Sequence, residues 1–263
     1  MKKSVCMATY NGARFIRQQL ESILPQLESG DEVVINDDCS TDPTCQVIAA
    51  CSDARIRLET NPRNLGPIRN FEKVIARATG ELIFLSDQDD IWLENKVSAT
   101  CAVFAQYPDV TLVFSNAELV NAEGQPLGRL LWQGALSAGV MRNLVKNRFL
   151  GCTLAFREGL RECALPFPDD LPMHDMWLGL VNALYGRGYY IAAPLIQYRV
   201  HSASATFHRR APSGRSTASL WQKTKWRLAL MKNLGFRQHK IRSASRTRMR
   251  LADRPPPTKA TSP

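Results

Sequence analysis

Residues 81–90 read Glu-Leu-Ile-Phe-Leu-Ser-Asp-Gln-Asp-Asp, an apolar run followed at once by three acids in four positions. The apolar part, residues 82–85, is short and uncharged, as is typical of a buried β-strand. The carboxylates of Asp87, Asp89 and Asp90 repel one another, so this cluster is costly unless a cation joins them. The alternative is a solvated acidic turn that caps the next helix, since Asp is a favoured N-cap residue.

Around this segment, short apolar runs alternate with segments of helical period from residue 4 to about residue 107. Strands are predicted at residues 4–9, 32–35, 55–59 and 81–85, and helices at residues 13–27, from residue 43, and at 67–79. Strands and helices in alternation, with nearly continuous apolar strands, predict a parallel, doubly wound α/β sheet. Such sheets bind ligands beyond the carboxyl ends of their strands, so functional residues are expected just after strands.

The pattern after residue 110 is mixed. It predicts strands at 110–114 and 149–156, a hairpin at 118–127 that turns at Glu123-Gly124, an irregular stretch at 128–147, a helix at 174–185, and short strands at 188–191 and 195–200. We therefore expect one domain over residues 1–205, with one half at 1–107 and the other at 108–205.

The net charge of +10 is unevenly distributed over the 263 residues. Residues 206–263 hold 15 of the 34 Lys and Arg residues but only one of the 24 acids, so they carry +14 and residues 1–205 carry −4. A helix predicted at about 217–234 mixes tryptophans with basic residues, which is typical of a membrane-surface element. The same charge would also bind nucleic acid non-specifically, or it could simply be solvated. The proline-rich end at 254–263 is predicted to be disordered.

Cysteine use and hydropathy indicate a cytoplasmic location. The seven cysteines form no Cys-x-x-Cys pair and no zinc ligand set, so a reducing compartment is the simpler interpretation. The first apolar run ends at Ala8, which is too short for a signal peptide. No stretch approaches 18 uncharged apolar residues, so no transmembrane span is expected.

Two more predicted strands end in polar residues. The first is followed by Tyr10-Asn11-Gly12 and the second by Asp37-Asp38-Cys39-Ser40-Thr41-Asp42. Each sequence could be an ordinary turn, the second with an N-cap for the helix that begins at Pro43. With the acids after residue 85, however, three strand ends place polar groups at one crevice. A ligand with the shape of a nucleotide is long enough to touch all three.

Four motifs in this order resemble family 2 glycosyltransferases with the GT-A fold: Ala8-Thr9-Tyr10-Asn11-Gly12, Asn36-Asp37-Asp38-Cys39-Ser40-Thr41-Asp42, Asn61-Pro62-Arg63-Asn64-Leu65-Gly66 and Ser86-Asp87-Gln88-Asp89-Asp90-Ile91-Trp92. The last of them is also similar to the rhamnosyltransferase-like branch that builds bacterial surface polysaccharides, as are Met173-His174-Asp175-Met176-Trp177 and Tyr198-Arg199-Val200-His201. The resemblance covers residues 3–205. It implies a Rossmann-like, mostly parallel sheet with a nucleotide-binding half and a smaller, mixed acceptor-side half.

The resemblance also implies individual roles. The donor-binding set would be Thr9, Tyr10, Asn11, Asp38, Asn64 and Asp87. Within it, Asp38 would accept the N3 hydrogen of uracil or thymine, and Asp87 would contact the ribose side. Asp89, the second acid of the Asp-x-Asp pattern, would coordinate the Mg²⁺ or Mn²⁺ ion that bridges the diphosphate. His201 matches a position near that metal.

Asp175 matches the catalytic base of the family. It also stands at the start of a predicted helix, among the apolar residues Met173, Met176 and Trp177. Apolar surroundings raise the pKa of a carboxyl group toward neutrality, which suits a general base, whereas the N-terminus of a helix stabilises its anion. Asp175 could instead be an ordinary first-turn acid. Its neighbour His174 is interpreted as a solvated or hydrogen-bonded residue without a role.

The resulting hypothesis is an inverting, metal-dependent glycosyltransferase that moves a sugar such as rhamnose from a dTDP- or UDP-sugar to a lipid-linked or polysaccharide acceptor. The basic tail would hold it at the inner face of the membrane, and no specific nucleic acid is expected as a partner. A nucleic-acid-binding protein would not explain the acidic strand ends, and a nucleotidyltransferase would need a Gly-rich phosphate loop that residues 9–12 lack. An inactive relative that serves as a binding module is disfavoured by the intact acids.

Overall fold

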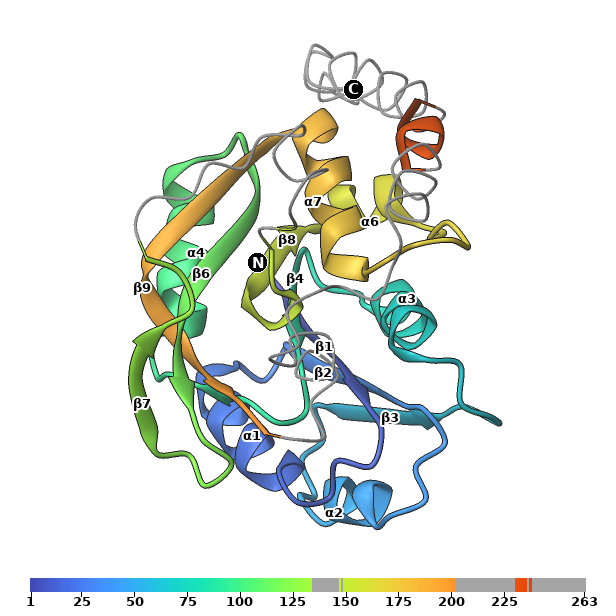
Figure 1. Ribbon diagram of the computed structural model, residues 1–263, viewed down its shortest axis with the longest axis vertical. Helices are drawn as coiled ribbons and strands as arrows, with labels where there is room; N and C mark the ends of the chain where they lie inside the picture. The colour runs from blue at the N-terminus through green and yellow to red at the C-terminus, as the bar shows by residue number, and fades with distance from the viewer. Residues whose placement is uncertain (134–146, 148, 202–229, 236, 238–263) are drawn as a thin grey trace, which may run out of the picture.

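Figure 1 shows the computed structural model of the chain, which describes residues 1–133, 147, 149–201, 230–235 and 237. Most of the helix predicted at 217–234, and the whole terminus predicted to be disordered at 254–263, lie outside these residues. Among the helices in the described ranges, none has both the length and the apolar character needed to cross a bilayer.

The first half confirms the predicted alternation of strands and helices. Its elements are β1 (Lys3–Thr9), α1 (Ile16–Ile23), a 3-10 turn η1 (Leu24–Gln26), β2 (Glu32–Asp37), α2 (Thr44–Ala49), β3 (Ile56–Thr60), α3 (Pro67–Arg77) and β4 (Leu82–Ser86). The helix predicted at 13–27 is shorter than expected, because Pro25 follows the end of α1 and cannot donate a backbone hydrogen bond.

The second half departs further from the expected elements. It contains β5 (Ile91–Trp92), α4 (Lys96–Gln106), β6 (Val110–Val120), β7 (Pro126–Leu130), a 3-10 turn η2 (Gly151–Thr153), β8 (Leu154–Arg157), α6 (Glu158–Ala164), α7 (His174–Tyr185) and β9 (Arg187–Arg199). The helix predicted at 174–185 is confirmed. The predicted strand at 149–156 is wrong in its first part, which forms η2, and α6 was not predicted.

Two predicted short strands are one long strand, β9, and β7 extends from the end of the predicted hairpin into the first three residues of the stretch predicted to be irregular. The pairing of β9 with β6 is irregular near Pro194, whose missing N–H interrupts the ladder. The register shift falls between Ile191 and Pro194, where the two predicted strands were separated. The hairpin of β6 and β7 is present, with its turn between Val120 and Pro126.

Within the described residues the strands form one sheet in the order β3-β2-β1-β4-β8-β6-β9-β5, with β7 paired to β6. β3, β2, β1 and β4 are parallel, as predicted, whereas β8 is antiparallel to both β4 and β6. The sheet is therefore parallel in its first half, over β1 to β4, and mixed in its second half. This is the α/β architecture expected of the GT-A fold.

Helices cover both faces of the sheet (Figure 1). Successive residues of β1 point to opposite faces: Cys6 packs with α3, α6 and α7, whereas Val5 and Met7 pack with α1, α2 and α4. The first of these cores also contains Leu230 and Leu234 of the basic extension, which are 2% and 6% exposed. The boundary predicted at residue 205 therefore does not separate residues 230–235 from the folded domain.

Candidate active site

The loops that follow β1, β2 and β4 are joined by hydrogen bonds at the carboxyl edge of the sheet. The side chain of Gln88 accepts from the backbone nitrogen of Tyr10 at 2.8 Å and donates to its carbonyl oxygen at 2.9 Å. Oδ1 of Asn11 accepts from the backbone nitrogen of Thr41 at 2.8 Å. The three polar strand ends predicted from the sequence therefore lie together.

The predicted donor-binding residues after β1 differ in their surroundings. Thr9 is buried, and its hydroxyl donates to Oδ1 of Asp37 at 2.9 Å. Asn11, whose φ of 50° lies in the left-handed region, uses its side-chain oxygen to hold the neighbouring loop. Tyr10 exposes 45% of its surface. Tyr10 and Asn11 are thus both exposed, and Asn11 also joins two loops, while Thr9 lies buried behind them.

Asp38 organises the loop after β3. Its carboxylate is 2% exposed and accepts hydrogen bonds of 2.8 Å from Nδ2 of Asn61 and from the backbone nitrogens of Leu65 and Gly66. Asn64 is exposed, and its Oδ1 accepts from the backbone nitrogen of Gly66 at 3.0 Å. The φ of +81° at Gly66 requires a residue without a Cβ. The side chains of Asp38 and Asn64 therefore hold the same loop, since both accept from the backbone nitrogen of Gly66.

The sequence interpretation missed the polar network behind Asp38. Asn61 and Asn70 are each 2% exposed, and Nδ2 of Asn61 donates to Oδ1 of Asn70 at 3.1 Å. Lys73 donates to Oδ1 of Asn61, and Asn70 donates to the carbonyl oxygen of Asn36 at 2.8 Å. A signal existed in the sequence, since Asn70 lies on the apolar face of the helix predicted at 67–79.

The acids after β4 form a compact cluster with a cysteine. One ligand atom each from Asp87, Asp90 and Cys152 lie within 4.8 Å of one another. Burial and the charges of Asp90 and Asp89 raise the pKa of Asp87 well above its ordinary value. Burial, with the charge of Asp89, raises the pKa of Asp90 to about 7. The mutual repulsion expected from the sequence is therefore present.

Lys96 supplies a cation behind this cluster. It is the first residue of α4, it is 1% exposed, and its Nζ donates to the carbonyl oxygen of Cys152 at 2.6 Å. The same nitrogen lies 4.3 Å from the ring centre of Trp92. Burial lowers the pKa of Lys96 to about 8, against the attraction of Asp90 and Asp87. The ammonium group of Lys96 thus supplies part of the positive charge that the acidic loop requires.

Asp89 and His201 meet although 112 positions separate them. Oδ2 of Asp89 lies 2.8 Å from Nε2 of His201, and the backbone oxygen of Asp89 accepts from Nε of Arg199 at 2.7 Å. The backbone nitrogen of Arg199 also donates to Oδ1 of Asp90 at 3.1 Å. The end of β9 is thus fastened to the acidic loop. A carboxylate oxygen beside an imidazole nitrogen suits a divalent ion such as Mn²⁺, with phosphate oxygens and water completing its shell.

Asp175 lies in the first turn of α7 and is 3% exposed. Its Oδ1 accepts from Nδ2 of Asn147 at 2.8 Å and from the backbone nitrogen of Met176 at 2.6 Å. Its charge also contributes to the raised pKa of Asp87, after burial and the charges of Asp90 and Asp89, so the two carboxylates interact electrostatically. The residue predicted as the base is therefore within electrostatic reach of the acidic loop predicted to hold the donor.

The interpretation of His174 as solvated or hydrogen-bonded is wrong. The ring is 4% exposed and stacks on Phe71 with centroids 4.0 Å apart. A Cβ on Gly151 would lie 2.6 Å from its Nε2, so only glycine fits there. Neither ring nitrogen has a hydrogen-bond partner among the residues that the structure describes. Burial lowers the pKa of His174 to about 3, so the ring is neutral near pH 7.

The burial of the neutral His174 ring predicts that the folded protein loses stability in acid. The unfolded ring binds a proton near pH 6.5 but the folded ring only near pH 3, so acidification within this window favours unfolding. His174→Phe should keep the stack on Phe71. Between pH 7 and pH 5 the free energy of unfolding of this variant should fall by about 2 kcal/mol less than that of the wild type, since each unit of pKa difference corresponds to about 1.4 kcal/mol. Urea unfolding of both proteins at the two pH values measures this. The raised pKa of Asp90 acts in the opposite direction in both proteins, and equal losses would contradict the prediction.

Comparison with known proteins agrees with this fold. The family model described as glycosyl transferase family 2 matches residues 4–162. These residues span β1 through α6 and include the loops that hold Asp38, Asp87 and Asp89. The chain belongs to glycosyltransferase family 2.

Particular relatives share most of the chain. One is the UDP-Glc:alpha-D-GlcNAc-diphosphoundecaprenol beta-1,3-glucosyltransferase WfgD of Escherichia coli, 28% identical over 68% of this chain and 69% of its own length. The structure of Staphylococcus aureus TarS with UDP-GlcNAc is similar with a TM-score of 0.62, at 20% identity over 78% of this chain and 60% of that chain. The mannosyltransferase PcManGT of Pyrobaculum calidifontis, solved with GDP-Man and Mn²⁺, gives a TM-score of 0.58 at 19% identity over 97% and 76%.

Proposed function

We propose that the protein is an inverting glycosyltransferase that transfers a sugar from a UDP- or dTDP-sugar to a lipid-linked saccharide during bacterial polysaccharide synthesis. The observation that carries the proposal is the acidic loop after β4, whose Asp87 interacts electrostatically with Asp175 in the first turn of α7. Hydrogen bonds join that loop to the loops after β1 and β2. A nucleotide sugar laid along these strand ends would bring its anomeric carbon toward Asp175.

In the proposed reaction Asp38 accepts from the nucleobase, and the acceptor hydroxyl lies at Asp175. The acceptor oxygen attacks the anomeric carbon and its proton passes to the carboxylate of Asp175. The bond between the anomeric carbon and the diphosphate oxygen breaks, and the nucleoside diphosphate leaves on the opposite face. The backbone nitrogen of Met176 and Nδ2 of Asn147 orient the carboxylate for this transfer.

Asp89 and His201 would hold a divalent ion, Mg²⁺ or Mn²⁺. When bound, such an ion stabilises the negative charge of the leaving diphosphate. The contact of 2.8 Å between their side chains supports this assignment, as does the Mn²⁺ in the PcManGT structure. Arg199 joins the end of β9, which leads to His201, to the acidic loop that contains Asp89.

The proposed acceptor is supported by the name of WfgD, which describes a saccharide diphosphoundecaprenol as its acceptor. The rhamnosyltransferase-like branch stays a prediction, based on the motifs at residues 86–92, 173–177 and 198–201. A donor-hydrolysis screen tests both the reaction class and the sugar. It would compare UDP-glucose, UDP-GlcNAc, dTDP-rhamnose and GDP-mannose with Mg²⁺ or Mn²⁺. We expect ion-dependent hydrolysis of a UDP- or dTDP-sugar above that of GDP-mannose. Failure to bind UDP or dTDP in calorimetry, with no hydrolysis, would contradict the proposal.

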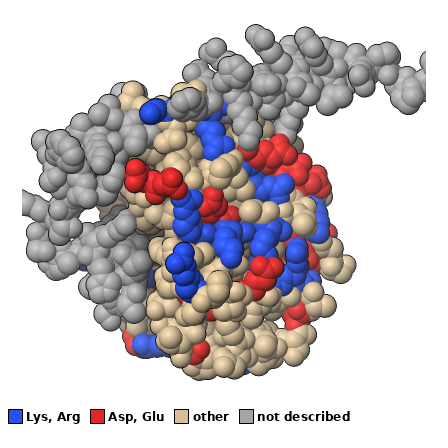
Figure 2. All heavy atoms as spheres, turned by 90° about the vertical axis from the view of Figure 1, so that its right-hand side faces the viewer, with Lys and Arg blue, Asp and Glu red and all other residues tan. Residues whose placement is uncertain are grey.

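We propose that the basic extension, residues 206–263, associates with the membrane, and not the face of the folded domain that carries α3. Figure 2 shows Lys and Arg beside Asp and Glu on the face that carries α3, where Arg77 pairs with Glu59 and Arg69 with Glu72. Such mixed charge does not attract an anionic bilayer. The +14 of residues 206–263 does, at about 1 kcal/mol for each basic residue near the surface. The proposed location is therefore the cytoplasmic face of the membrane.

Removal of residues 238–263 should weaken binding to anionic vesicles, because it deletes seven of the 15 basic residues while keeping Leu230 and Leu234. Sedimentation of the full-length and shortened proteins with anionic vesicles at low and high salt measures the effect. Binding of the full-length protein should fall as salt screens the charges. Neutral vesicles are the control. Equal, salt-independent sedimentation of the two proteins would contradict the prediction.

A further inference from the structure

Four consecutive backbone carbonyls at the end of α6 accept hydrogen bonds from distant side chains. The guanidinium of Arg237 donates to three of them and the indole of Trp177 to the fourth. The acceptors are the carbonyl oxygens of Cys163, Leu165 and Pro166 for Arg237, and that of Ala164 for Trp177. The last carbonyls of a helix lack partners within the helix and favour a nearby cation. We refer to residues 163–166 as the carbonyl anchor.

The carbonyl anchor is linked to the proposed base through α7. Trp177 is fully buried and donates from Nε1 to the anchor at 2.9 Å. Asp175 lies two residues earlier in the first turn of the same helix. A displacement of the anchor would therefore be transmitted to the turn that carries Asp175.

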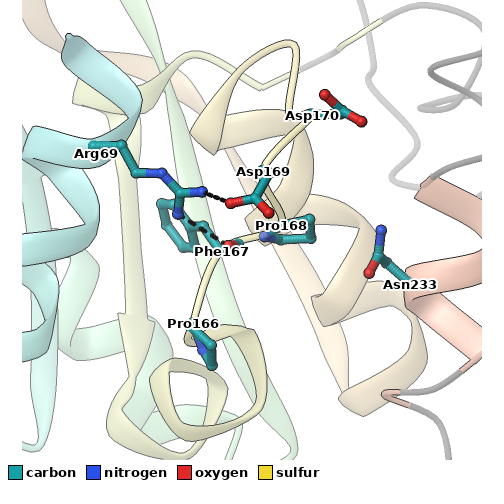
Figure 3. A pocket seen from close by; sticks show the side chains of 7 residues that line it. All are labelled: Arg69, Pro166, Phe167, Pro168, Asp169, Asp170 and Asn233. Atoms are coloured by element: carbon teal, nitrogen blue, oxygen red, sulfur yellow. Dashed lines mark hydrogen bonds and ion pairs between the residues drawn. The ribbon is translucent and has the colours of Figure 1, made fainter. Parts of the chain in front are cut away.

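The segment that leads from the anchor to α7 is also held by α3. Arg69 donates to the carbonyl oxygen of Phe167 at 3.0 Å and pairs with Asp169, and the backbone nitrogen of Phe167 donates to Glu72 at 2.7 Å. Arg69, Phe167, Asp169 and Asn233 are among the residues that line a cavity of about 690 Å³. Figure 3 shows Arg69 reaching Phe167 and Asp169, with Asn233 of the C-terminal helical segment on the other side. The segment thus runs between α3 and the C-terminal helical segment.

The C-terminal helical segment, residues 230–235, is held to the domain by its own apolar residues. Leu230 and Leu234 belong to the same core cluster as Met176 and Trp177. This packing brings Arg237 to the anchor. Burial there lowers the pKa of Arg237. A guanidinium presents several N–H groups in a planar fork and can serve three carbonyls, whereas the compact ammonium of lysine does not match this geometry.

We propose that Arg237 is a positioning residue for Asp175, acting through the carbonyl anchor and Trp177; this rests on the proposed role of Asp175 as the base. The basic extension then has two separate functions. Its distal part would carry charge toward the membrane, and residues 230–235 with Arg237 complete the support of the active site. Loss of the guanidinium should move the base relative to the acceptor, and a misplacement of about 1 Å can cost about 100-fold in rate.

Arg237→Lys and Arg237→Ala test the proposal, with Lys232→Ala as the matched control because Lys232 is an exposed cation of the same helical segment. Hydrogen–deuterium exchange, which needs no substrate, should be faster at residues 173–177 in both Arg237 variants than in the control. Exchange at the β1 and β2 loops should be unchanged. Arg237→Lys keeps the charge and most of the stem, so it remains informative if Arg237→Ala does not fold. Unchanged exchange at residues 173–177 would overturn the proposal.

The kinetic part of the test separates positioning from general stability. The kcat of donor hydrolysis should fall by about 10- to 100-fold in Arg237→Ala, while UDP affinity measured with Mn²⁺ stays at the wild-type value. Guanidinium ion should restore part of kcat in Arg237→Ala. In an Asp175→Asn background, Arg237→Ala should have little further effect, because the two residues would act through one step. Parallel losses of kcat and UDP affinity, or full additivity, would overturn the positioning role.

These outcomes distinguish the two proposals. If Asp175→Asn transfers sugar at the normal rate, the assigned base is wrong. If Asp175→Asn is inactive but the Arg237 variants behave like Lys232→Ala, only the positioning role is wrong.

Discussion

Asp175→Asn should lower the rate of sugar transfer by about 10²- to 10⁴-fold, the usual contribution of a general base, and leave donor affinity nearly unchanged. The amide keeps the size of the side chain but cannot take up the proton of the acceptor hydroxyl. Donor affinity should persist because the nucleotide would lie along the loops after β1 and β2, on other elements than α7. Steady-state transfer assays and calorimetry with UDP measure the two quantities separately.

Asp170→Asn is the matched control, because Asp170 is an exposed carboxylate five residues before Asp175. It should transfer sugar like the wild type. A normal rate in Asp175→Asn, or a loss of UDP binding in that variant, would place the base at another residue.

Asp89→Asn should weaken Mn²⁺ binding by about 100-fold or more, since changes to outer-shell partners alone cost about 10- to 100-fold. The substitution removes the carboxylate oxygen that lies 2.8 Å from His201 and one negative charge from the loop. Titration of Mn²⁺ in the presence of UDP, followed by electron paramagnetic resonance, measures affinity without requiring turnover. Turnover should fall with it, and EDTA should abolish the turnover of the wild type.

The control for this substitution is Asp109→Asn, which removes an exposed carboxylate that pairs with Arg187 at the other end of β6. Its Mn²⁺ affinity should match that of the wild type. Wild-type turnover that survives EDTA, or unchanged Mn²⁺ affinity in Asp89→Asn, would contradict the metal assignment.

Much of the site could be predicted from the sequence because its residues stand next to strand ends. Asp38, Asp87 and Asp89 each follow a short apolar run, and parallel strands carry such positions to one edge of the sheet. Asp175 was predicted as the first-turn residue of a helix whose bounds are confirmed. What these residues bind remains a proposal, since position alone does not identify a ligand.

The residues that support the site were not predictable in the same way. Lys96 looks like a solvated helix residue in the sequence, yet it is buried beneath the acidic loop against Cys152. His174 looks like a solvated neighbour of the base, yet it stacks on Phe71. Arg237 lies in a strongly basic tail whose charge suggests a membrane surface, nucleic acid or solvent as its surroundings, yet it binds the end of α6. Each depends on a partner more than 50 positions away in the chain.

The sequence by itself determined the alternation of strands and helices in the first half, because hydrophobic periodicity is a local property of neighbouring residues. It also determined which carboxylates stand at strand ends. Only the tertiary structure decided that residues 187–199 form one strand, that residues 151–153 form a turn, and that residues 230–235 pack into the core. The physical reason is that burial and pairing are set by contacts between distant segments. The same polar side chain is solvated or structural depending on which segment packs against it.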